Sequence, residues 1–177
     1  ALREDQRRES DVSLDVSFGG VTVSSPREPF VYRFADPVLG EQNRPVGGAP
    51  AVSLSFDRGL EWMPAGKPVD RMLRVTVQSY STSARRYALK VIAPKGISVD
   101  SATRTVALEP LETREVFLRI RGTLPEGRFE FGVIAEGEMG RYYEGFRTIE
   151  YSHIRPIRLY RSSALWLQSV AINVPAG

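Results

Sequence analysis

The sequence predicts an all-β protein built on an immunoglobulin-like antiparallel β-sandwich, with additional strands on its N-terminal side. Two observations predict this fold class. Apolar and polar residues alternate repeatedly between residues 71 and 136, and Pro- and Gly-containing turns separate the alternating runs. A period of two is typical of a strand with one dry and one wet face. Short strands that recur at this spacing predict two sheets whose apolar faces bury each other.

Each alternating run marks one expected strand of the sandwich. In the first run Leu73, Val75 and Val77 face one way, and the polar residues between them face the other. Further runs place apolar residues at Tyr87, Leu89 and Val91, at Val116, Leu118 and Ile120, and at Phe129, Phe131 and Val133. Turns are expected at Pro94-Lys95-Gly96, Glu109-Pro110 and Leu124-Pro125-Glu126-Gly127.

The rest of the chain is divided around this block. Residues 1–10 are expected to form a linker, and residues 11–57 to add N-terminal strands as a partial or packed-on sandwich. Among these strands, Gly19-Gly20 is expected to turn a hairpin. Residues 58–155 are expected to form the immunoglobulin-like sandwich, and residues 156–177 to be a C-terminal tail that leads toward a missing neighbour.

Composition narrows the possible partners. Hydrophobic residues make up 42% of the 177 residues and charged residues 25%, which is typical of a folded domain with a solvated surface. A net charge of +3 is too small to indicate a nucleic-acid partner. No apolar run approaches the roughly 20 residues of a membrane-spanning helix, so no membrane partner is expected. The lack of cysteine excludes disulfides and thiolate metal sites.

No catalytic constellation is predicted. His153 is the single histidine, whereas a hydrolytic zinc site typically takes two or three imidazoles and a carboxylate. No Ser lies in a G-x-S-x-G elbow, and no glycine-rich phosphate loop is present. We therefore expect no catalytic residue, no metal and no cofactor. Tyr151 and His153 are expected to be structural, with the imidazole hydrogen-bonded to backbone where a strand ends.

Residues 35–50 form the longest stretch without periodicity and are expected to be a loop. Long loops in compact domains are usually functional or linkers. The candidate docking residues in and beside this loop are Tyr32, Arg33, Asp36, Glu41 and Arg44. The last three are close enough in sequence to form an ion-pair cluster, which either pins the loop against a neighbouring domain or is a purely structural salt bridge.

Aromatic residues give the other binding signal. Trp62 and Trp166, with Tyr142, Tyr143 and Phe146, offer flat apolar faces on which a sugar can stack. The alternative is that they fill the core and the ends of the sandwich. For Trp62, which lies beside a turn, both interpretations stay open, and a glycan remains a possible partner.

Two stretches carry a family resemblance. The first contains Tyr32-Arg33, Asp36-Pro37, Gly40-Glu41 and Arg44-Pro45 and the strand that follows them; the second is IEYSHIRPIRLYR, residues 149–161. In this order they resemble the non-catalytic region of large bacterial deacetylases of the PIG-L (LmbE-like) family. Residues 71–136 are also similar to the NPCBM-associated sandwich domain linked to α-galactosidases. The resemblance covers roughly residues 30–161.

The resemblance implies a location rather than an activity, because the family's His-Pro-Asp-Asp catalytic motif is missing here. We expect a non-catalytic accessory module that packs against and orients other domains of the same polypeptide, in an extracellular or periplasmic protein. Two alternatives stay open: a carbohydrate-binding module that uses Trp62, and an adhesion or assembly domain that pairs its edge strands with other chains.

Overall fold

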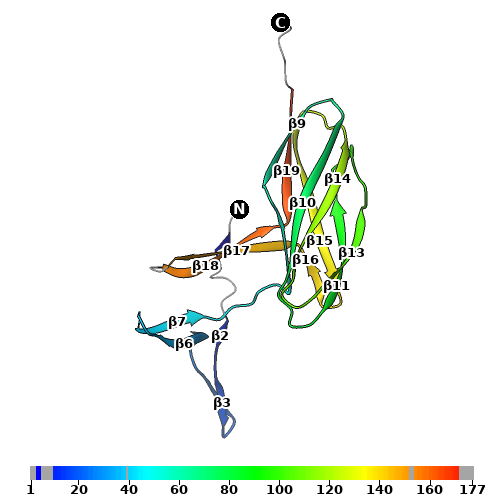
Figure 1. Cartoon of the computed structure of the whole chain (residues 1–177). Coiled ribbons are helices and arrows are strands. Elements are labelled where there is room, and N and C mark those ends of the chain that lie inside the picture. Colours follow the sequence, from blue (N-terminus) through cyan, green and yellow to red (C-terminus); the bar gives the residue numbers. More distant parts are fainter. Residues whose placement is uncertain (1–2, 5–9, 39, 152–153, 172–177) are drawn as a thin grey trace. The chain divides into compact units, whose positions relative to one another are not determined.

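The computed structural model describes residues 3–4, 10–38, 40–151 and 154–171, and every regular element among them is a β-strand. The chain forms two compact units (Figure 1). One comprises chiefly residues 50–146 and 160–177, and the other comprises residues 2–49 and 147–159. The protein is therefore all-β, as the alternation predicts.

The first unit is a sandwich of two sheets. One sheet has the order β12-β14-β10-β8 and contains β8 (Val52–Phe56), β10 (Val69–Ser79), β12 (Ile97–Val99) and β14 (Thr113–Gly122). The other has the order β13-β11-β15-β19-β9, with β16 also paired to β15. Its strands are β9 (Leu60–Pro64), β11 (Arg85–Ile92), β13 (Thr103–Leu108), β15 (Gly127–Gly137), β16 (Gly140–Tyr142) and β19 (Ala164–Val170). β10 and β14 are neighbours in the first sheet, and β11 and β15 are neighbours in the second, as the B and E strands and the C and F strands are in an immunoglobulin domain.

The expected inward faces form the core. Leu73, Val75 and Val77 of β10 are at most 2% exposed, and the register places them opposite inward residues of β14 and β8. The facing sheet contributes its own alternate residues to the same cluster. Phe56 and Phe131 join the two sheets, with ring centroids 6.0 Å apart in an edge-to-face arrangement. One continuous core between the sheets is what a sandwich requires.

A close backbone contact fixes one end of this sandwich. Gly122 ends β14 with a φ of 149°, and a Cβ there would lie 1.9 Å from the carbonyl oxygen of Gly96. Gly96 lies in the expected turn between β11 and β12, and it accepts a hydrogen bond from the Thr123 amide at 3.0 Å. Glycine is required because any side chain would collide with that turn.

The second unit consists of one small sheet and three antiparallel two-stranded pairings. A three-stranded sheet has the order β1-β18-β17, and three two-stranded pairings are β2–β5, β3–β4 and β6–β7. The strands of the sheet are β1 (Arg3–Glu4), β17 (Glu144–Tyr151) and β18 (Ile154–Ser162). The remaining strands are β2 (Asp11–Val12), β3 (Asp15–Phe18), β4 (Val21–Ser24), β5 (Glu28–Pro29), β6 (Val31–Asp36) and β7 (Gly40–Pro45). The predicted turn at Gly19-Gly20 is confirmed, and it joins β3 to β4.

The structure corrects the expected boundaries. Residues 52–56, expected with the N-terminal strands, form β8 of the sandwich, where Val52 and Leu54 are fully buried. The expected C-terminal tail contains β19, which pairs with β15 and buries Leu165 and Leu167 completely. Residues 3–4 of the expected linker are a strand. The physical reason is that β15 needs a neighbour on its second side, and β19 supplies it from a distant part of the chain.

Candidate functional site

The expected docking loop is a β-hairpin. β6 and β7 pair in a register that sets Tyr32 opposite Arg44 and Phe34 opposite Gln42. Tyr32 and Phe34 stack with ring centroids 5.6 Å apart and planes 19° apart. The Arg44 guanidinium carbon lies 4.9 Å from the centroid of the Phe34 ring. Two aromatic rings and one cation therefore form a row on one face of the hairpin.

The register of the hairpin does not bring the three residues of the expected ion-pair cluster to one face. Directly opposed residues share a face of an antiparallel pair, so Asp36 and Arg44 lie on one face and Glu41 on the other, with Arg33. A carboxylate oxygen of Asp36 accepts a hydrogen bond from the Val38 amide at 2.8 Å, which closes the turn of the hairpin. Closeness in sequence does not place side chains on the same face of a strand, so the register does not support a cluster of all three residues.

Of the two residues expected to be structural, Tyr151 and His153, the structure describes only Tyr151. Tyr151 ends β17 and is 60% exposed. His153 lies outside the described residues. Among the described residues, no group of three His, Asp or Glu side chains is arranged to hold a metal ion. In the same part of the chain, no helix is long and apolar enough to span a membrane.

Trp62 lies on the outer face of the sandwich. It belongs to β9, which pairs in parallel with β19 so that Trp62 is opposite Gln168 and Leu60 is opposite Trp166. Trp62 is 60% exposed and Trp166 is 37% exposed. The Arg128 guanidinium carbon lies 4.1 Å above the Trp166 ring. Sequence reasoning singled out both tryptophans but missed Arg128, because only the pairing of β15 with β19 brings it there.

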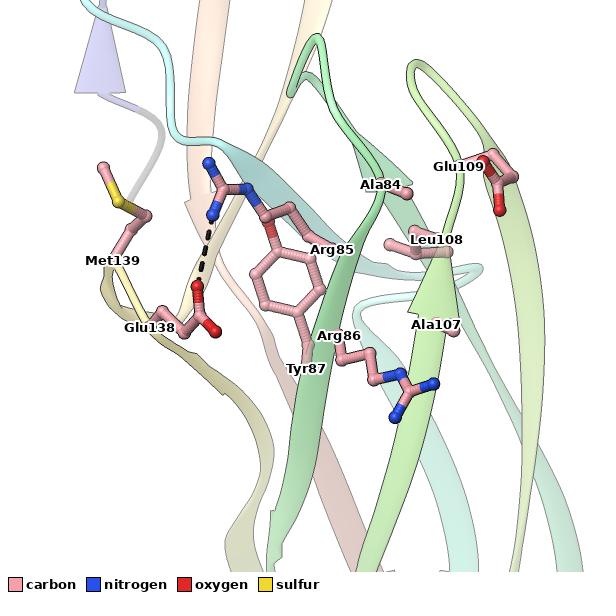
Figure 2. Close-up of a pocket in the computed structure, with 9 residues that line it drawn as sticks. All are labelled: Ala84, Arg85, Arg86, Tyr87, Ala107, Leu108, Glu109, Glu138 and Met139. Carbon is pink, nitrogen blue, oxygen red and sulfur yellow. Dashed lines mark hydrogen bonds and ion pairs between the residues drawn. The ribbon is translucent and has the colours of Figure 1, made fainter.

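A cavity of about 350 Å³ opens where β11 begins, β13 ends and β15 turns into β16 (Figure 2). It is lined by Ala84, Arg85, Arg86, Tyr87, Ala107, Leu108, Glu109, Glu138 and Met139. Figure 2 shows Arg85 directed toward Glu138, with a nitrogen–oxygen distance of 3.3 Å, and Arg86 directed away from this pair. Tyr87 is 3% exposed, and burial raises the pKa of its hydroxyl. Two basic and two acidic side chains offset each other, so the cavity offers a polar wall without a net field for a charged ligand.

Charge on the other sheet is paired. The Arg119 guanidinium donates two hydrogen bonds of 2.7 Å to Asp70, and Arg121 donates a third at 3.1 Å. The Arg119 hydrogen bonds lower the pKa of Asp70 from 3.8 to about 2. On the sheet that contains the cavity, a hydrogen bond from Lys90 of β11 likewise lowers the pKa of Glu136 on β15. Carboxylates held ionised by arginine or lysine are poor proton donors, so these clusters stabilise the surface rather than equip it for acid catalysis.

No family model matches the chain, and no curated protein matches it. Among solved structures, the native conformation of E. coli alpha-2-macroglobulin is similar over 84% of this chain, with 13% identity and a TM-score of 0.48. The chain spans 9% of the length of that protein's chain. At this identity and TM-score the likeness has no bearing on function.

Proposed function

We propose that this chain is a non-catalytic accessory module that packs against and orients other domains of the same polypeptide. The observation that carries the proposal is the apolar face of the β3–β4 hairpin, which is exposed along its whole length. A large exposed apolar patch on a soluble protein typically marks an interaction site.

The register defines this face. Val16 is opposite Val23 and Phe18 is opposite Val21, so these four side chains share one side of the hairpin, with Leu14 two residues before Val16. Their exposed fractions range from 54% for Val16 to 88% for Phe18. We call these five residues the apolar hairpin face.

The opposite side of the hairpin is polar. Asp15 is opposite Ser24 and Ser17 is opposite Thr22, and the hydroxyls of Ser17 and Thr22 are hydrogen-bonded at 2.7 Å. The alternation is therefore the same as in a core strand, but the dry side is open to solvent. A two-stranded hairpin is marginally stable alone in water, so a partner that covers this side would also stabilise the hairpin.

The size of the face favours a tethered partner. Its five side chains offer roughly 400 Å² of apolar surface, if an exposed aromatic contributes about 180 Å² and each aliphatic residue about 60 Å². A stable interface between free proteins usually takes about 800 Å² from each partner. A domain linked in the same polypeptide needs less, because the linker supplies an effective concentration in the millimolar range.

The setting of the module remains a proposal drawn from the family resemblance. If the neighbour is a PIG-L-type deacetylase domain, the protein is exported and the neighbour removes N-acetyl groups from amino sugars. The gene around residues 1–177 tests this directly. A reading frame that encodes a His-Pro-Asp-Asp domain would support the setting, whereas a frame without such a domain would refute it.

The packing role is tested with the double variant Phe18→Ser/Val21→Ser, in the 177-residue chain and in the longer polypeptide that contains it. The matched control is Ser17→Ala/Thr22→Ala, which changes the opposite side of the same hairpin. In the 177-residue chain, the Phe18→Ser/Val21→Ser variant should bind less of a dye specific for exposed apolar surface. In the longer polypeptide, it should make a flanking domain unfold separately from the sandwich. Unchanged coupled unfolding in that variant would refute the proposal.

A further inference from the structure

The outer face of the six-stranded sheet carries a patch whose composition differs from the charged outer face of the other sheet. Leu60 and Trp62 come from β9, and Trp166 and Gln168 from β19. On the other side of β19, Glu130 is opposite Trp166 and Arg128 is opposite Gln168. Three adjacent strands thus bring together two indoles, an aliphatic side chain, an amide, a guanidinium and a carboxylate. We call these six residues the tryptophan patch.

Packing within the sandwich does not account for Trp62. The inward residues next to it on the paired strands, Met63, Leu165 and Leu167, are at most 2% exposed and fill the core. Trp62 points outward and keeps 60% of its surface in solvent. Among the described residues, no aromatic ring or cation is stacked on Trp62. Its neighbour Trp166 differs, because Arg128 covers one side of that ring.

The polar groups of the patch select the kind of ligand. Arg128 and Glu130 carry opposite charges two residues apart on the same face of β15, so together they present no net charge. A polyanion such as a nucleic acid would be attracted by Arg128 and repelled by Glu130. An uncharged ligand that carries both hydrogen-bond donors and acceptors would be complementary to both groups and to the amide of Gln168.

A pyranose ring has this combination of properties. Its axial C–H groups form an apolar face that matches the flat surface of an indole, and its hydroxyl groups both donate and accept hydrogen bonds. Leu60 widens the apolar floor beside Trp62, and the guanidinium, carboxylate and amide lie along the neighbouring strands. We propose that the tryptophan patch binds a neutral sugar unit of a glycan, stacked on Trp62. This activity goes beyond the packing role and uses a different part of the chain.

The protein offers a direct readout, because it contains two tryptophans and both lie in the patch. Titration of the 177-residue chain with neutral oligosaccharides (linear glucans and chitooligosaccharides) at millimolar concentration should shift Trp emission to shorter wavelength as the sugar displaces water from Trp62. The same glycans in a native gel should slow the protein. No spectral shift and no retardation with any of these glycans would overturn the proposal.

Variants assign the effect to the patch. Trp62→Ala should weaken binding roughly tenfold or more, because the stacking surface is removed. Glu130→Gln keeps the shape of the side chain and should weaken binding less. Phe117→Ala is the matched control, because Phe117 is a 48% exposed aromatic on the other sheet. It should bind like the unchanged protein.

Circular dichroism of each variant separates loss of binding from loss of fold, and Trp62→Phe provides a second test that keeps a ring in place. Binding that is retained in Trp62→Ala would overturn the proposal. Equal weakening of glycan binding in Phe117→Ala and Trp62→Ala, with both variants folded, would also overturn the proposal. Either result leaves the packing role untouched, because the apolar hairpin face contains no residue of the patch.

Discussion

The packing of β19 can be measured through Leu167→Ala. Leu167 is fully buried in the strand that sequence reasoning treated as a tail. The substitution removes three carbon atoms from the core, which costs roughly 2.4 kcal/mol in transfer free energy at about 0.8 kcal/mol per methylene. The residual cavity adds to this cost, and buried Leu→Ala changes typically cost about 2–5 kcal/mol. We expect the free energy of unfolding to fall by about 3 kcal/mol.

Urea denaturation followed by Trp fluorescence measures this loss in the sandwich alone, because both tryptophans lie in β9 and β19. For a chain of this size, the expected loss corresponds to a decrease in Tm of about 6–12 °C. Leu111→Ala is the matched control, since it makes the same chemical change at a position that is 67% exposed, and it should cost less than about 0.5 kcal/mol. A loss below about 1 kcal/mol in Leu167→Ala would refute the packing of β19 against the core.

Two further predictions concern charge and backbone geometry. Because the pKa of Asp70 is lowered from 3.8 to about 2, its pairing with Arg119 should stabilise the fold above pH 4 and lose this effect as the pH falls toward 2. Asp70→Asn should therefore be less stable than the unchanged protein at neutral pH, and the difference in stability should disappear as the pH falls below about 2. Titration of the Asp70 carboxyl near its ordinary pKa would contradict this. Gly122→Ala should destabilise the sandwich by about 3 kcal/mol or more, because its Cβ would meet the Gly96 carbonyl oxygen. Gly140→Ala has a similar positive φ but open space, so thermal unfolding should show a smaller loss, and equal losses would refute the steric argument.

Local alternation was enough to predict the fold class. Leu73, Val75 and Val77 show why: a buried face in an antiparallel strand forces apolar residues to every second position, and this period is visible in the sequence. The turn at Gly19-Gly20 was predictable for a similar reason, because the backbone of a tight hairpin favours glycine.

β7 was missed because its residues, GEQNRP, contain no apolar alternation. Both faces of this strand are polar, and its pairing with β6 rests on backbone hydrogen bonds and on cross-strand contacts such as that of Arg44 with Phe34. Propensity and periodicity report burial on one side, so they have no signal for such a strand.

The binding surfaces were only partly predictable. Trp62 was singled out as a residue, but its neighbourhood depends on the parallel pairing of β9 with β19, two strands about a hundred residues apart in the sequence. Arg128 and Glu130 enter the tryptophan patch through the pairing of β15 with β19. Contacts of this kind are set by topology, which no local pattern encodes. The same limit explains why β19 was expected to leave the domain.

Hydrogen exchange of the β3–β4 hairpin tests the central claim, that its apolar face packs on a neighbouring domain. The measurement compares the amides of Asp15–Phe18 and Val21–Ser24 in the 177-residue chain with the same amides in the longer polypeptide. In the short chain they should exchange rapidly, because an isolated two-stranded hairpin opens readily. In the longer polypeptide they should be protected as strongly as the strands of a packed sheet. Equally fast exchange in both would contradict the claim.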